Sequence, residues 1–351
     1  MERLEIPFGE KGHLSLERYE KQMLFNEIGQ EGQKKLLSKK AVIIGCGALG
    51  TVISNNLARS GVGYLRIIDR DYIEISNLQR QILFDEEDIE NNLPKAIAAE
   101  KKLRKINSSI YIESRITDVN SKNIEGLCTG MDIILDATDN LQTRYLINDI
   151  SIKLNIPWVY GGVIGSSGMV HTIIPHIAPC LRCMFPEMPP IGSTETCDTV
   201  GVLNSITSIV ASMESMEAMK ILIDRKDAVI KGLLYMDIWN NDFEMIDLKI
   251  DKNCTVCGKN QFEILNTTFD EAVYLCGKNS IQINPLQKSV STESIVNRLK
   301  ALDIDYKQNV YFIKFNVEDV QITLFYDGRA ILKNTSDINR ARSLYARYIG
   351  S

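Results

Sequence analysis

The chain has 351 residues, of which 44% are hydrophobic and 24% charged, and its formal net charge is −5. These values are ordinary for a soluble globular protein, and the negative net charge argues against the positively charged surface that a nucleic-acid-binding protein needs. No apolar run approaches the roughly 18 residues that cross a bilayer, and the polar N-terminus lacks a signal peptide's apolar core. We therefore expect a cytoplasmic protein with one large and one small domain, binding neither nucleic acid nor membrane.

The first half of the chain alternates helical and strand patterns. Residues 15–38 are expected to form two helices, broken at Gly29 and Gly32. Residues 39–180 then alternate strands and helices, which predicts an α/β fold, a Rossmann-like, doubly wound and mostly parallel sheet. The expected strands are Lys40–Ile44, Tyr64–Asp69, Ile110–Ser114, Met131–Asp136 and Trp158–Tyr160, and the expected helices are Thr51–Ser60 and Lys95–Ile106.

The second half begins with a long crossover loop at residues 185–204, rich in Pro, Gly, Ser and Thr, followed by a helix from about Val202 to Ile223. The first domain is expected to span residues 1–259, and a small α+β C-terminal domain residues 260–351, in the order β-α-β-β-α. Its expected helices are Thr292–Leu302 and Asp337–Tyr348, with a hairpin turning at Asp327-Gly328.

A glycine motif joins the first strand of the α/β fold to the helix after it. It reads Gly45-Cys46-Gly47-Ala48-Leu49-Gly50. Glycines let the backbone approach a phosphate, and the helix N-terminus adds N–H groups and partial positive charge. Asp69 ends the next strand, where it is placed to accept hydrogen bonds from ribose hydroxyls. The alternative is a tight turn without ligand. The motif predicts a nucleotide and does not separate NAD from ATP.

Two cations follow the acidic residue. Ser76, Asn77 and Arg80 lie in one polar segment, and Lys95 begins a helix after Pro94. Arg80 and Lys95 would hold the β- and γ-phosphates of a triphosphate and offset charge as pyrophosphate leaves. Taken singly, each residue fits a solvated polar loop equally well. Behind the glycine motif and Asp69, they favour ATP.

Asp139 and Asn140 follow a strand, at the sheet edge where α/β proteins place ligands. Asp139 is the candidate Mg²⁺ ligand, because Mg²⁺ is usually held by one or two carboxylates plus substrate phosphates. The alternative is that Asp139 caps the helix beginning near Gln142.

The cysteines form two C-x-x-C pairs. In a reducing compartment, such pairs are interpreted as metal ligands before disulfides. Four thiolates suit a closed, structural Zn²⁺ site that would join the start of the crossover loop to the end of the first domain. The alternative is two redox-active or free pairs. The four residues are Cys180, Cys183, Cys254 and Cys257.

Cys197 lies unpaired in the crossover loop. A following helix N-terminus favours its thiolate, whereas Glu195 and Asp198 disfavour it, so a reactive thiol and a bystander both stay open. Cys46, Cys128 and Cys276 are expected in the core.

Together these motifs closely resemble the ThiF/MoeB/HesA family of ubiquitin-activating-enzyme-like adenylyltransferases, in a bacterial ThiF-like form with a C-terminal extension. The resemblance rests on RYEKQ, GCGALG, DRD, SNLQRQ, LPK, DATDN and the two cysteine pairs, from Arg18 to Cys257. It implies that MgATP adenylates the C-terminal glycine of a ubiquitin-like sulfur carrier ending in Gly-Gly, of ThiS or MoaD type. A sulfur donor such as a cysteine desulfurase would then form a thiocarboxylate, for thiamine or molybdopterin biosynthesis.

The resemblance also assigns roles. It gives the nucleotide to the glycine motif, the ribose to Asp69 and Mg²⁺ to Asp139 beside Asn140. It implies a homodimer in which the N-terminal helix carrying Arg18 and Lys21 packs against the partner subunit, and Lys21 reaches into the partner's site. The remaining roles are phosphate binding by Ser76, Asn77, Arg80 and Lys95, Zn²⁺ binding by the paired cysteines, and sulfur transfer by Cys197.

Two positions depart from the family pattern. Ala48 replaces a glycine near the phosphates. Lys21 replaces an arginine, which keeps the charge but loses bidentate phosphate contact. Slower activity and a shared role for Arg18 are both open.

Two other functions compete with adenylylation. A NAD-dependent oxidoreductase is favoured only by the glycine motif and Asp69, and it leaves Arg80, Lys95 and the cysteine pairs without a role. A non-catalytic nucleotide-sensing scaffold would recruit a partner through the C-terminal domain. Carrier-dependent ATP–pyrophosphate exchange separates the three, because only the adenylyltransferase shows it.

Overall fold

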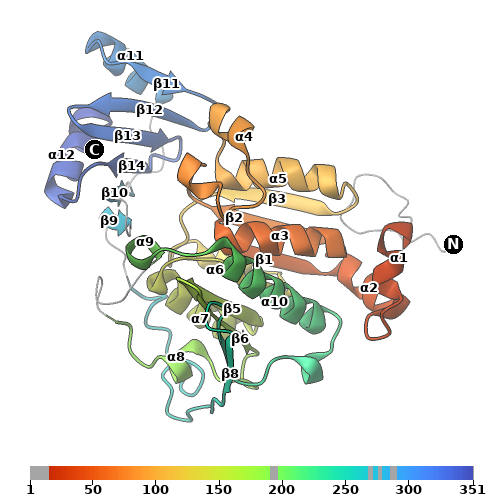
Figure 1. Cartoon of the computed structure of the whole chain (residues 1–351). Coiled ribbons are helices and arrows are strands. Elements are labelled where there is room, and N and C mark those ends of the chain that lie inside the picture. The colour runs from red at the N-terminus through yellow and green to blue at the C-terminus, as the bar shows by residue number, and fades with distance from the viewer. Residues whose placement is uncertain (1–15, 190–196, 268–271, 276–278, 285–290, 351) are drawn as a thin grey trace. The chain divides into compact units, whose positions relative to one another are not determined.

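The computed structural model describes residues 16–189, 197–267, 272–275, 279–284 and 291–350. The chain divides into two compact units, Met1–Thr267 and Thr268–Ser351 (Figure 1). The division lies slightly beyond the predicted boundary at residue 260. No helix in the described ranges combines the length and the apolar content that a membrane crossing requires.

The first unit is built on an eight-stranded sheet in the order β3-β2-β1-β4-β5-β6-β7-β8. The first five strands in this order are parallel, and β6, β7 and β8 continue the sheet in antiparallel fashion. In the centre, Ile43 of β1 pairs with Ile67 of β2 and Leu135 of β4. The strands are β1 Lys40–Ile44, β2 Tyr64–Asp69, β3 Tyr111–Ile116, β4 Ile133–Asp136, β5 Trp158–Ile164, β6 Ser167–Ile173, β7 Leu233–Asp237 and β8 Asp242–Ile246.

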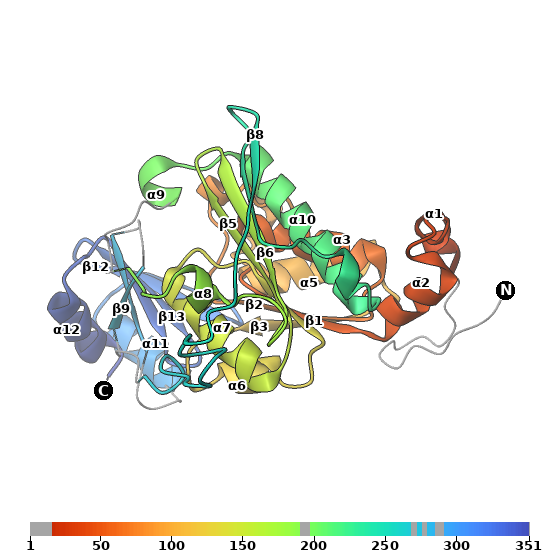
Figure 2. The same ribbon diagram turned by 90° about the horizontal axis from the view of Figure 1, so that it is seen from below.

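Helices cover both faces of this sheet (Figure 2). α3, α5 and α10 pack on one face, and α6, α7 and α8 lie on the other. This arrangement confirms the doubly wound, mostly parallel α/β fold. The helices are α1 Glu20–Met23, α2 Gly29–Ser38, α3 Ala48–Ser60, α4 Glu86–Glu90, α5 Lys95–Ile106, α6 Ile124–Cys128, α7 Leu141–Leu154, α8 Leu181–Met184, α9 Cys197–Val200 and α10 Asn204–Leu222, with 3₁₀ turns η1 Leu16–Tyr19, η2 Ile75–Asn77 and η3 Lys226–Ala228.

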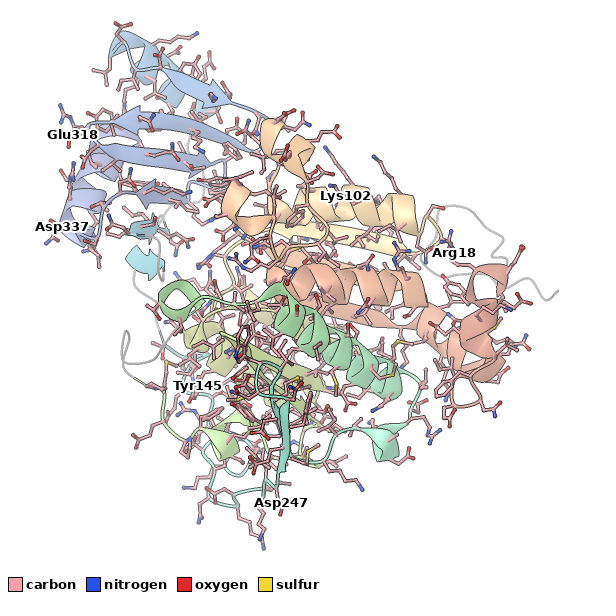
Figure 3. All side chains as sticks on the ribbon, viewed as in Figure 1. Arg18, Lys102, Tyr145, Asp247, Glu318 and Asp337 are labelled. Atoms are coloured by element: carbon pink, nitrogen blue, oxygen red, sulfur yellow. The ribbon has the colours of Figure 1, made fainter. Side chains whose placement is uncertain are left out.

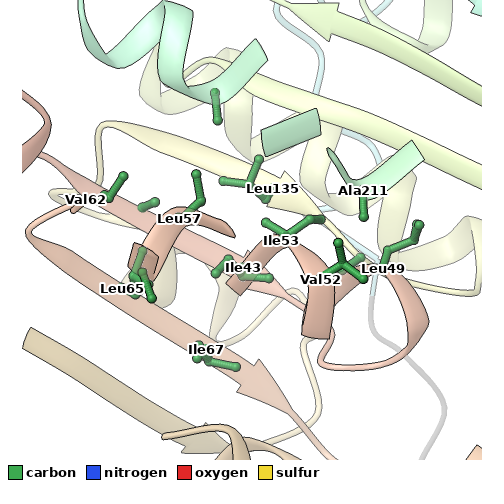
Figure 4. Packing of buried hydrophobic residues seen from close by; sticks show 14 of the residues in the cluster. Ile43, Leu49, Val52, Ile53, Leu57, Val62, Leu65, Ile67, Leu135 and Ala211 are labelled. Atoms are coloured by element: carbon green, nitrogen blue, oxygen red, sulfur yellow. The ribbon is translucent and has the colours of Figure 1, made fainter. Parts of the chain in front are cut away.

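On one face of the sheet, the hydrophobic core includes residues of β1, α3 and α10 (Figure 4). β1 is a continuous apolar run because a central parallel strand is buried on both faces. Val52, Ile53 and Leu57 of α3 form an apolar stripe that meets Ala211 of α10. Truncating Ile53, which is fully buried, to alanine would cost on the order of 2–5 kcal/mol.

The N-terminal helices differ from the prediction. α2 begins at Gly29, so only that glycine lies at the break, and Gly32 lies inside the helix. A Cβ at Gly32 would stand 3.3 Å from Cγ2 of Ile28 and 3.6 Å from Cγ2 of Ile223. This glycine therefore permits close packing of α2. Likewise, α3 begins at Ala48, within the glycine motif.

The second unit is a six-stranded sheet in the order β11-β12-β13-β14-β10-β9, in which every described pair is antiparallel. Its core includes Ile281, Phe315, Ile322 and Leu344. The predicted hairpin at Asp327-Gly328 is confirmed, but the predicted order β-α-β-β-α had too few strands. The elements are β9 Ala272–Leu275, β10 Ser280–Ile283, α11 Thr292–Ala301, β11 Tyr306–Gln308, β12 Phe312–Val317, β13 Val320–Phe325, β14 Ala330–Lys333 and α12 Ile338–Tyr348.

Candidate nucleotide and metal sites

The three glycines of the motif have different surroundings. Gly45 has φ +98°, and a Cβ there would stand 2.3 Å from the carbonyl oxygen of Ala137. A Cβ at Gly50 would stand 2.1 Å from the carbonyl oxygen of Gly45. Both glycines are required by the packing of the turn itself. At Gly47, the nearest atom to a Cβ is Nε2 of Gln81 at 3.9 Å, so this side of the turn is open.

The Asp69 carboxylate forms a hydrogen bond with the backbone of the glycine turn. Its Oδ2 accepts a hydrogen bond from the backbone N–H of Cys46, and its Oδ1 from that of Asp71, both at 2.7 Å. Burial raises the pKa of the Asp69 carboxyl, while Lys95 and the two N–H donors oppose this rise. The predicted ribose contact stays a prediction.

Lys95 is the centre of a group of charges beside this turn. It begins α5, is buried, and its Nζ lies 3.3 Å from Oδ2 of Asp71. Burial alone lowers the pKa of Lys95, but the nearby carboxylates of Asp71, Asp69 and Asp139 raise it above its ordinary value. Burial likewise lowers the pKa of Arg70, but the carboxylates of Asp118, Asp71 and Asp139 raise it above its ordinary value. The structure thus brings Asp69, Lys95 and Asp139 together. Sequence reasoning overlooked Asp71 and Arg70, although the DRD motif contains both.

The segment after η2 lies beside the glycine turn, where Gln81 approaches Gly47. Asn77 is buried, and its Oδ1 accepts from the N–H of Glu74, so its described bond is structural. Ser76 is exposed. The partly exposed Arg80 donates from Nη1 to the carbonyl of Ser76 at 3.0 Å. The phosphate roles of these residues stay predictions.

Asp139 is exposed, and Asn140 caps α7 by accepting from the N–H of Thr143 at 2.8 Å. The alternative in which Asp139 caps this helix is therefore wrong. An exposed carboxylate close to Lys95 fits a Mg²⁺ ligand that shares the metal with substrate phosphates.

A largely buried polar cluster adjoins the Asp139 loop. Arg144 of α7 donates from Nε to Asp136 at 3.1 Å and from Nη2 to the carbonyls of Thr138 and Gly161, both at 2.9 Å. Glu214 of α10 is fully buried against Gly161, and neither carboxyl oxygen has a described hydrogen-bond partner. Sequence reasoning missed Arg144, for which the spacing Asn140, Arg144, Asn148 along one helix face was an available signal.

The four paired cysteines form one cluster. Their Sγ atoms all lie within 4.8 Å of one another, at 3.9 Å for Cys180–Cys183, 3.6 Å for Cys180–Cys254 and 3.4 Å for Cys183–Cys257. A tetrahedral Zn²⁺ with Zn–S bonds of ~2.3 Å requires Sγ–Sγ separations of about 3.8 Å. The cluster therefore fits structural zinc.

Asn148 of α7 supports this cluster. Its Oδ1 accepts from the N–H of Leu181 at 2.8 Å, and its Nδ2 lies 3.8 Å from Sγ of Cys180. Metal ligands are commonly oriented by such outer contacts. Cys46 and Cys128 are buried, as predicted. The side chains of Cys197 and Cys276 lie outside the described part of the structure.

Arg18 and Lys21 lie far from Lys95 along the first unit. Arg18, labelled in Figure 3, donates to the carbonyl of Ile106, the last residue of α5. Lys95 is the first residue of the same helix, so about 17 Å of helix separates the two ends. Lys21 is exposed in α1.

Comparison with known proteins agrees with this geometry. Residues 19–256 match the ThiF family. The chain is 40% identical over 339 residues to the sulfur carrier protein ThiS adenylyltransferase of Bacillus subtilis, covering 95% of this chain and 99% of that protein. It is 37% identical over 244 residues to the SAMP-activating enzyme E1 of Haloferax volcanii, covering 70% of this chain and 89% of that one.

Among solved structures, Escherichia coli MccB with ATP shares the fold, with a TM-score of 0.61, 22% identity and coverage of 69% of this chain and 74% of that one. The chain belongs to the ThiF family. It is a nucleotidyltransferase, which rules out the oxidoreductase alternative.

Proposed function

We propose that this enzyme uses MgATP to adenylylate the C-terminal glycine carboxylate of a ubiquitin-like sulfur-carrier protein. The observation that carries the proposal is the group of charges next to the glycine turn. Asp69 accepts from the N–H of Cys46 in the turn, Lys95 pairs with Asp71, and the carboxylates of Asp71, Asp69 and Asp139 all act on Lys95. The B. subtilis relative, similar over nearly its whole length, is named for the same reaction on ThiS.

In the proposed reaction, a carboxylate oxygen of the carrier attacks the α-phosphorus of ATP. The bond between that phosphorus and the bridging oxygen breaks, and pyrophosphate leaves. The backbone at Gly47 would approach the phosphates, while Lys95 and Arg80 would neutralise the leaving pyrophosphate. Mg²⁺ bound at Asp139 would supply further positive charge. Because Lys95 is buried, it is preorganised and its charge is weakly screened.

We further propose a homodimer. The outer face of α10 and the β7–β8 hairpin carry large exposed apolar side chains, with Trp239 76% and Phe243 61% exposed. A groove of about 450 Å³ on α10, lined in part by Ile209, Met213 and Met216, belongs to the same face. Apolar surface of this kind marks interaction sites. A partner subunit would also explain Arg18 and Lys21, which lie at the wrong end of α5 to serve their own site.

The test is ATP–pyrophosphate exchange with purified carriers ending in Gly-Gly. We expect exchange that requires both a carrier and Mg²⁺, and that disappears when the terminal glycine of the carrier is deleted. Thiamine-type and molybdopterin-type carriers, tested side by side, identify the pathway, and a cysteine desulfurase added afterwards tests thiocarboxylate formation. Tight ATP binding without exchange, for every carrier tried, would favour the nucleotide-sensing scaffold instead.

A further inference from the structure

Arg144 connects three separate pieces of the first unit. Its guanidinium bonds to Asp136 at the end of β4, to the carbonyl of Thr138 in the loop before α7, and to the carbonyl of Gly161 in β5. It also lies over the ring of Tyr160, with 5.1 Å from Cζ to the ring centroid. Only a planar, forked cation reaches acceptors in such different directions.

The loop that carries Asp139 is fixed on both sides of that residue. Asp136 Oδ1 accepts from the backbone N–H of Thr138 at 2.9 Å and from its hydroxyl at 2.7 Å. Arg144 holds the carbonyl of Thr138, and Asn140 is fixed as the cap of α7. Every described bond in this loop is therefore made by a neighbour of Asp139, and the Asp139 carboxylate itself is left exposed.

Charge around Arg144 strengthens this arrangement. Burial lowers the pKa of its guanidinium, but Asp136, Tyr160, Asp139 and Glu214 raise it above its ordinary value. Burial raises the pKa of Glu214 well above the ordinary range, so Glu214 favours the neutral form and competes weakly for Arg144. Asp136, which is fully buried, forms the described ion pair with Arg144, at 3.1 Å from Nε.

We infer that Arg144 is a positioning residue that fixes the Asp136–Asn140 loop so that the Asp139 carboxylate is presented to the metal–phosphate group beside Lys95. This inference rests on the proposed function, since it concerns the metal of that reaction. It assigns Arg144 no contact with substrate. Because Arg144 already orders the loop in the free enzyme, less conformational entropy is lost when the nucleotide and the metal bind at Asp139.

The test follows binding of a fluorescent ATP analogue while MgCl₂ is varied. Arg144→Lys keeps the charge but cannot hold both carbonyls. We expect it to raise the Mg²⁺ concentration for half-maximal binding tenfold or more, with analogue affinity in the absence of Mg²⁺ within twofold of the unsubstituted enzyme. Arg66→Lys is the matched control, because Arg66 is also part-buried and bonds Glu113 and the carbonyl of Leu127. It is expected to lower the urea midpoint without moving the Mg²⁺ curve.

A double-variant comparison separates positioning from general damage. Asp139→Asn is expected to remove most of the Mg²⁺ dependence, and adding Arg144→Lys to it should then have no further effect on that dependence. Additive effects, or an unshifted Mg²⁺ curve in Arg144→Lys, would overturn the inference. If Arg144→Lys fails to fold, Thr138→Val removes one bond to Asp136 and should shift the curve less, in the same direction. If the unsubstituted enzyme shows no carrier-dependent ATP–pyrophosphate exchange, the proposed function is contradicted. The Mg²⁺ dependence of analogue binding can still be measured, so the two failures are distinguishable.

Discussion

Substituting the glycines of the nucleotide turn one at a time separates a ligand-binding loop from a tight turn. Gly47→Ala places a methyl group on the open side of the turn, where the nearest atom is 3.9 Å away. Gly45→Ala instead forces a Cβ to 2.3 Å from the carbonyl oxygen of Ala137, at φ +98°. The two variants differ by one methyl group each, but we expect them to fail in different ways.

The magnitudes follow from these surroundings. Gly47 is the N-cap of α3, so its replacement by alanine should cost at most about 1 kcal/mol of stability. For Gly45→Ala, left-handed backbone strain alone costs roughly 1–3 kcal/mol, before the clash with Ala137. If the methyl group at Gly47 removes one charge-assisted hydrogen bond to phosphate, worth about 1.5–3 kcal/mol, ATP affinity falls roughly ten- to a hundredfold.

Two measurements decide this: urea unfolding for stability, and calorimetric titration with MgATP for affinity. Gly126→Ala is the control, since Gly126 lies in α6 with nothing within 4 Å of its Cβ position, and it should bind ATP normally. A Gly47→Ala enzyme that binds ATP as tightly as the unsubstituted protein would refute the assignment of the open side to phosphate.

Three further predictions concern other parts of the first unit. Purified protein should contain about one Zn²⁺ per chain bound by four sulfurs, and Cys180→Ser should lower the melting temperature more than ATP affinity; metal-free protein of equal stability would contradict this. Burial raises the pKa of Asp149 from 3.8 to about 6, so this group's contribution to the unfolding free energy is lost as pH rises across that window. In urea titrations, Asp149→Asn should remove this slope, and an unchanged slope would exclude Asp149 as its source. Mixing the inactive variants Lys21→Ala and Arg80→Ala should restore some exchange through heterodimers, and no recovery despite subunit exchange would place Lys21 outside the partner's site.

The elements with strong local signals could be predicted from the sequence. β1 is an almost continuous apolar run, β2 is rich in apolar residues and ends at Asp69, and Pro94 marks the start of α5, so these predicted bounds match the structure. The strand β8 could not be predicted in this way, because its five residues are all exposed and show no buried alternation. In the homodimer proposed above, a partner subunit would cover its apolar side chains.

Candidate site residues that belong to sequence motifs could be selected from the sequence, whereas residues whose role depends on burial could not. Asp139 and Lys95 were selected as candidates because they follow a strand and a proline, respectively. Arg144 and Glu214 lie inside helices, where a charged residue ordinarily faces solvent, and only the packing of α7 and α10 shows that Arg144 is part-buried and Glu214 fully buried. The same packing shows that Asn140, and not Asp139, caps α7.

One face of α7 joins the candidate nucleotide edge to the cysteine cluster. Asn140 caps its first turn, Arg144 bonds the Asp139 loop, and Asn148 holds Leu181 and approaches Cys180. Asn140 and Asn148 are eight residues apart, or about 12 Å along the helix. None of the described bonds at Arg144 involves a cysteine, so loss of a bound metal should loosen the far end of α7 and leave the Asp139 loop in place. This is the structural reason to expect that zinc removal lowers stability more than nucleotide affinity.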